Sequence, residues 1–128
     1  MLNFFKFMQP SSVRKGSVTV HTKKLIESDL KNVDVLLQGK KPSQLRQALI
    51  TTDKALDNAL KDVVIGENMG ERLKNASDIF DRDLYKKIWS AHKMRNSVVH
   101  ESGYEPPYHM VNQGIDNLKR GLRTLGVN

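Results

Sequence analysis

A stripe of apolar side chains over residues 43–64 constrains the fold more than any other part of the chain. Apolar and small residues recur there three and four positions apart, which places them on one face of an α-helix. They are Leu45, Ala48, Leu49, Thr52, Ala55, Leu56, Ala59, Leu60 and Val63. A helix with such a face buries it against other elements. The spacing therefore predicts a long helix over about 43–64 that packs against further helices.

Other parts of the chain have the same helical spacing. Further helices are expected at residues 20–37, at 67–76 as a short helix or turn, from 81 or 83 to 101, and at 107–125. Gly39 is placed to end the first helix, and Ser43 is placed to cap the second. Strand-like alternation is confined to residues 17–20. Four main helices plus a short one, joined by short connections, predict an all-α, antiparallel bundle.

The first 17 residues differ from the rest in composition. We expect a flexible, apolar and basic tail over residues 1–17, followed by one helical domain over 18–128. Phe4, Phe5, Phe7 and Lys6 could hold residues 1–8 on the surface of an anionic membrane. The alternative is a tail that packs loosely or not at all. No stretch reaches the roughly 20 apolar residues that a spanning helix needs.

Composition narrows the classes of function. The absence of cysteine excludes disulfides, thiol nucleophiles and Cys-ligated zinc, and it suits a reducing cytoplasm. Lys and Arg number 21 against 14 Asp and Glu, a formal net charge of +7. A basic protein attracts polyanions such as RNA. Membrane-surface proteins and many ordinary domains share this charge, so it does not by itself identify a partner.

Arg95 is the unusual residue of the helix expected at 81–101. It lies on the apolar stripe, between Ala91 and Val98. A guanidinium cannot be deprotonated in a protein, and burying it without a partner is costly. Arg95 is therefore expected to pair with an internal Asp or Glu, to reach water in a cleft, or to bind an anion.

A second stripe on this helix is polar. His92, Asn96 and His100 are spaced by four residues and share one face. His100 lies about 140° around the helix from Arg95, so the two would flank a groove. Two antiparallel copies would bring each His near the other chain's Arg. His100 could instead interact favourably with the negative, C-terminal end of the helix dipole. His92 could simply pack against neighbouring side chains. The spacing does not match a metal site, so no metal or cofactor is expected.

The segment Arg95-Asn-Ser-Val-Val-His100 resembles the Arg-x4-His signature of the HEPN (higher eukaryotes and prokaryotes nucleotide-binding) superfamily. The Asn after the Arg, the two apolar residues before the His and the position at the end of the penultimate helix all match. The resemblance implies a helical bundle, a homodimer with two motifs in one cleft, and metal-independent cleavage of single-stranded RNA. It also implies that Arg95 and His100 are catalytic and that Asn96 supports them.

The chemistry that this resemblance implies suits the residue types. A neutral His100 would take the proton of a ribose 2′-OH, and Arg95 would stabilise charge on the attacked phosphoryl group. The products would be a 2′,3′-cyclic phosphate and a free 5′-OH, formed without a cofactor. Asn96 would orient His100 or bond a phosphate. The residues expected to contact RNA are His92, Lys93, Lys86, Lys87 and Tyr104, although such lysines are often only solvated surface charges.

Other roles in that superfamily give alternatives. Some members are toxins, which makes a nucleotidyltransferase-like antitoxin a candidate partner and a toxin or defence role an expectation. In one branch the antitoxin modifies a Tyr two residues after the His. Ser102 holds that place here, and the nearest tyrosine is Tyr104, which counts against this regulation. Other members are non-catalytic, so a nucleotide- or protein-binding module is the alternative function. A plain helical scaffold is the third.

Overall fold

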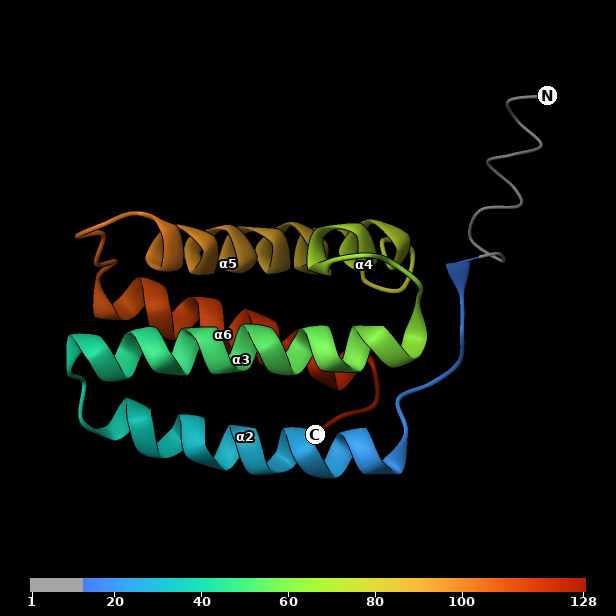
Figure 1. Ribbon diagram of the computed structural model, residues 1–128, viewed down its shortest axis with the longest axis horizontal. Coiled ribbons are helices and arrows are strands. Elements are labelled where there is room, and N and C mark those ends of the chain that lie inside the picture. The colour runs from blue at the N-terminus through green and yellow to red at the C-terminus, as the bar shows by residue number, and fades with distance from the viewer. Residues whose placement is uncertain (1–12) are drawn as a thin grey trace.

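A computed structural model describes residues 13–128 and shows an all-α bundle (Figure 1). Its helices are α2 (Val20–Gln38), α3 (Pro42–Val63), α4 (Met69–Asn75), α5 (Arg82–His100) and α6 (Tyr108–Thr124). The predicted all-α bundle of four main helices and a short one is therefore confirmed. The segment 1–8 lies outside the described residues, so the choice between membrane contact and a loosely packed tail stays open.

Helix α3 is the centre of the bundle and packs against each of the other four helices. All nine members of its predicted stripe are buried, which confirms the interpretation of the spacing. Followed from blue to red in Figure 1, α2 and α5 run in one direction and α3 and α6 in the other. The C-terminal end of α5 therefore lies at the same end of the bundle as the first turns of α3 and α6. Among the described helices, none has both the length and the apolar composition to cross a bilayer.

The helix ends follow the expected signals with one exception. Asp81 caps α5, since its side chain accepts a hydrogen bond from the Leu84 N–H at 2.9 Å. Gly39 ends α2 as expected. The prediction that Ser43 caps α3 is wrong, because the helix already begins at Pro42. Proline has the helical φ built in and lacks the N–H that a cap would satisfy, which favours it as the first helical residue.

The chain contacts the bundle upstream of α2. Val13 accepts a hydrogen bond from the Ile65 N–H at 2.9 Å, and the Lys15 N–H donates to the Val63 carbonyl at 2.8 Å. Arg14 lies 3.0 Å from an Asp78 oxygen. Residues 13–15 of the segment that we assigned to the tail are thus held against the connection after α3.

Two glycines let α6 approach α5 closely. A Cβ atom on Gly121 would lie 2.9 Å from Ile88 Cδ1, and one on Gly114 would lie 3.6 Å from Ala91 Cβ. Gly114 and Gly121 are seven residues apart and therefore face the same side of α6. This contact fixes the helix that carries the Arg-x4-His motif.

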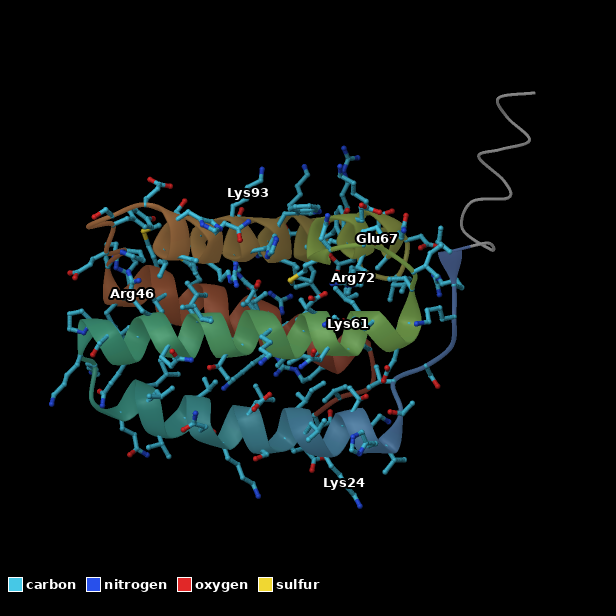
Figure 2. The ribbon with its side chains drawn as sticks, in the orientation of Figure 1. Lys24, Arg46, Lys61, Glu67, Arg72 and Lys93 are labelled. Carbon is cyan, nitrogen blue, oxygen red and sulfur yellow. The ribbon has the colours of Figure 1, made fainter. Side chains whose placement is uncertain are left out.

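A buried ion pair attaches α4 to α3. Arg72 Nε and Nη2 donate to the two Asp57 carboxylate oxygens at 2.7 and 2.9 Å, and Nη1 donates to the Gly66 carbonyl at 2.7 Å. The hydrogen bonds to Asp57 raise the pKa of Arg72 above its ordinary value. Figure 2 shows Arg72 between α3 and the connection that leads to α4. All three donors act in fixed directions that only a guanidinium supplies.

We expect Arg72→Lys to lower the free energy of unfolding by about 1–2 kcal/mol, since an ammonium cannot form the same paired hydrogen bonds. Urea unfolding at neutral pH measures the change. Lys74→Arg, an exposed exchange on the same helix, serves as the control and should change stability by less than about 0.5 kcal/mol. Equal stability of Arg72→Lys and the wild type would show that the paired geometry contributes nothing.

Candidate functional site

A buried carboxylate lies at the centre of the candidate site. Asp53 on α3 is only 3% exposed and sits on the core face, four residues after Leu49 and three before Leu56. A buried charge is tolerated only when it is paired and hydrogen-bonded. Both partners of Asp53 come from α5, and both belong to residues that the sequence singled out.

His92 is the first partner. Its Nδ1 atom lies 3.1 and 3.2 Å from the two Asp53 carboxylate oxygens. Because a carboxylate oxygen accepts hydrogen bonds, Nδ1 is the donor in this pair. The ring also packs edge-on against Trp89, with centroids 5.9 Å apart. His92 is 8% exposed, so we assign it to holding Asp53 rather than to the RNA contact expected from the sequence.

Arg95 is the second partner, and it remains partly open to solvent. Its Nε atom is buried and lies 3.7 Å from Asp53 Oδ2, and Nη1 donates to Asn96 Oδ1 at 3.0 Å. The side chain as a whole is 30% exposed. Of the three environments expected for Arg95, the structure combines an internal carboxylate near the buried Nε with partial exposure of the side chain to solvent.

His100 stands apart from this cluster. It is the last residue of α5 and is exposed, and within the described residues its ring makes no hydrogen bond. It lies five positions after Arg95, which is about 7.5 Å along the helix axis. The structure thus joins His92 and Arg95 through Asp53, joins Asn96 to Arg95 directly, and leaves His100 apart at the helix end.

The other expected RNA contacts are spread over the surface. Lys86, Lys87 and Lys93 are exposed on α5, and Figure 2 shows Lys93 directed away from the bundle. Lys87 forms a surface ion pair with Asp83 at 2.9 Å, which lowers the pKa of that carboxyl group. Tyr104 is half-buried and packs against the core. The three lysines are therefore exposed to a polyanion, although Lys87 is shared with Asp83.

Asp53 is the residue that sequence reasoning missed. An internal Asp or Glu is one of the three environments that the sequence allows for Arg95, but the spacing does not identify which residue it is. A signal was present, because Asp53 occupies a core position of the best-defined amphipathic helix in the chain. A charged residue at such a position predicts a buried partner on a neighbouring helix.

No three His, Asp or Glu side chains come together as a possible metal site within the part of the chain that the structure describes. No family model matches the sequence, and neither the curated proteins nor the solved structures include a significant match. The HEPN resemblance therefore depends on the motif and the order of helices, and it stays a prediction.

Proposed function

We propose that the protein is a metal-independent endoribonuclease of the HEPN type that cleaves single-stranded RNA as a homodimer. The observation that carries this proposal is the combination of contacts and solvent exposure of the Arg95 side chain. This side chain lies beside the buried Asp53 and donates a hydrogen bond to Asn96, is 30% exposed to solvent, and lies on the same helix as an exposed terminal His100. An anchored cation with an accessible edge is suited to binding a phosphate.

In the proposed reaction, neutral His100 takes the proton from a ribose 2′-OH, a role that suits an exposed imidazole near neutral pH. The 2′-oxygen then forms a bond to the adjacent phosphorus, and the bond from phosphorus to the 5′-oxygen breaks. The leaving 5′-oxygen takes up a proton from a histidine side chain in its imidazolium form or from water. A 2′,3′-cyclic phosphate and a free 5′-OH result.

Arg95 stabilises the negative charge that builds up on the phosphoryl oxygens during this step. Such a donor works best when it is already oriented, since no reorganisation is then needed as the charge develops. Asn96 supplies part of that orientation by accepting a hydrogen bond from Nη1, and Asp53 attracts Nε across 3.7 Å without a hydrogen bond. Both act as positioning residues, because neither would touch the phosphate itself.

A second copy of the chain completes the site in this proposal. Arg95 and His100 differ by about 140° in direction around α5, which separates them within one chain. A twofold axis beside α5 would place each His100 opposite the other chain's Arg95, as isologous contacts do. The net charge of +7 would draw RNA to the shared cleft.

A chemically modified RNA tests the reaction. We expect cleavage of a single-stranded oligonucleotide to be unchanged by EDTA, to yield 2′,3′-cyclic phosphates, and to stop only at a linkage whose 2′-OH is replaced by hydrogen. Mass spectrometry of the products measures each result. Loss of cleavage in EDTA, or equal cleavage of the all-DNA analogue, would overturn the proposal.

The alternative is a non-catalytic module that binds a nucleotide or a protein. The ion pair between Asp53 and Arg95 favours it, because a partly neutralised guanidinium suits binding without chemistry. This alternative predicts no cleavage, together with nucleotide binding that weakens in Arg95→Ala. A toxin role with a nucleotidyltransferase-like antitoxin remains an expectation from the resemblance.

A further inference from the structure

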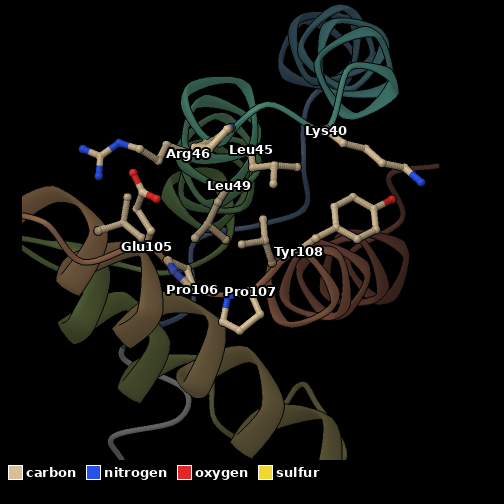
Figure 3. Close-up of a pocket in the computed structure, with 11 residues that line it drawn as sticks. Lys40, Leu45, Arg46, Leu49, Glu105, Pro106, Pro107 and Tyr108 are labelled. Carbon is tan, nitrogen blue, oxygen red and sulfur yellow. The ribbon is translucent and has the colours of Figure 1, made fainter.

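A pocket of about 310 Å³ opens at the end of the bundle where α5 stops (Figure 3). Its inner wall is apolar and includes Leu45 and Leu49 of α3, Val98 of α5 and Val111 of α6. The rim carries Lys40, Arg46, Glu105 and Tyr108. Pockets of this size with apolar walls and a few polar groups at the mouth are typical of small organic ligands.

The pocket lies at the same end of the bundle as the last turn of α5. Val98 in its wall is three residues after Arg95 and on the same side of the helix, and the loop that follows His100 reaches the rim at Glu105. Because α3 and α5 run in opposite directions and Asp53 meets Arg95, residues before Asp53 face residues after Arg95. Arg46 lies seven residues before Asp53, about 10.5 Å along the axis, which brings it to the His100 end. Figure 2 shows it there.

The chemistry of the rim indicates what the pocket would take. Figure 3 shows the Arg46 guanidinium and the Glu105 carboxylate on the same side of the mouth, and Lys40 Nζ lies 5.0 Å above the centre of the Tyr108 ring on the other. The two cations, Arg46 and Lys40, favour an anionic group at the mouth of the pocket, and the apolar walls favour a weakly polar group inside it. A nucleotide has both parts, and single-stranded RNA is recognised through such splayed-out bases.

We propose that this pocket receives one nucleobase of the RNA, beside the bond that is cut. Arg46 binds the adjoining phosphate with its forked N–H groups. Glu105 accepts a hydrogen bond from the base, which selects bases with an exocyclic amino group such as cytosine or guanine over uracil. The proposal extends the proposed ribonuclease function, and it assigns base preference to Glu105.

Titration of the full-length, isotope-labelled protein with each of the four nucleoside 5′-monophosphates tests the pocket without any cleavage. We expect the amide signals of Leu49, Val98 and Val111 to shift, with tighter binding of the cytidine and guanosine nucleotides than of the uridine nucleotide. Arg46→Met should weaken binding about tenfold, since it removes charged hydrogen bonds to the phosphate. Glu105→Gln should reduce the difference between bases. Lys24→Met, on the exposed side of α2, is the matched control and should bind as the wild type does.

Cleavage assays separate this inference from the proposed function. In an active enzyme, Arg46→Met should raise KM about tenfold with little change in kcat. Cleavage that depends on His100 without pocket shifts or base preference would overturn the pocket and leave the ribonuclease standing. Pocket shifts with a Glu105-dependent preference but no cleavage would support the pocket and overturn the ribonuclease. No shift with any nucleotide at millimolar concentration, or shifts only with an acidic, apolar peptide, would overturn the pocket.

Discussion

His100→Ala is expected to lower the rate of RNA cleavage by about a thousandfold, which is the usual contribution of a positioned general base. The imidazole is exposed at the end of α5 and makes no hydrogen bond within the described residues, so its loss leaves the core intact. The free energy of unfolding should therefore stay within about 0.5 kcal/mol of the wild type. Cleavage of a fluorescent oligonucleotide and urea unfolding measure the two quantities.

His21→Ala is the matched control, since His21 is also exposed but lies on α2. It should cleave at the rate of the wild type. Activity of His100→Ala equal to that of the control, in a preparation free of contaminating ribonuclease, would exclude His100 as the base and with it the proposed mechanism.

Mixing two inactive variants tests whether the site is shared between copies. In a heterodimer of His100→Ala and Arg95→Gln, one cleft keeps an intact His100 from one chain and an intact Arg95 from the other. Random exchange makes half of the dimers mixed, so recovery of about a quarter of the wild-type activity is expected for isologous sites. If mixing restores no activity, each chain must act with its own Arg and His.

The fold could be predicted from the sequence because apolar spacing and helix-end signals depend only on residues close together in the chain. The apolar spacing of α3 alone identified nine core residues. Asp81 indicated where α5 begins, and Gly39 indicated where α2 ends. Ser43 was misjudged because two adjacent signals competed, and Pro42 prevailed as the first helical residue. This error moves the cap by two residues, from Ser43 to Lys41, and leaves the bundle unchanged.

The candidate site was less predictable because it depends on how helices align. The apolar surroundings of Arg95 showed that it needs a partner, but Asp53 lies 42 positions earlier in the sequence. Which carboxylate meets it is decided by the register of α3 against α5. The two glycines of α6 help to set that register by fixing α5 in place. The same register turns His92 inward, although the helical face predicted from spacing groups it with Asn96 and His100.

His92→Leu is expected to lower the free energy of unfolding by about 3 kcal/mol, because it leaves the buried Asp53 carboxylate without its hydrogen-bond donor. Arg95 at 3.7 Å offsets only part of this loss. Asp53→Leu combined with His92→Leu should recover about 2 kcal/mol relative to His92→Leu alone, since apolar replacement of a buried pair is often nearly neutral. Urea unfolding of both single variants and the double variant gives the coupling energy.

A surface pair provides the control for this cycle. Lys119 and Asp34 lie 3.1 Å apart, and Asp34 is 65% exposed, so Asp34→Leu should cost less than about 1 kcal/mol. If the costs of Asp53→Leu and His92→Leu simply add, the two residues do not depend on one another.

The same double variant separates stability from function. Its fold is restored, yet Arg95 has lost the carboxylate that orients its guanidinium. We therefore expect kcat for RNA cleavage to fall at least about tenfold while KM changes little, as happens when an interaction made only in the transition state is removed. A double variant with wild-type kcat would show that Asp53 stabilises the bundle without positioning Arg95. The guanidinium would then stabilise the transition state without a buried carboxylate beside it.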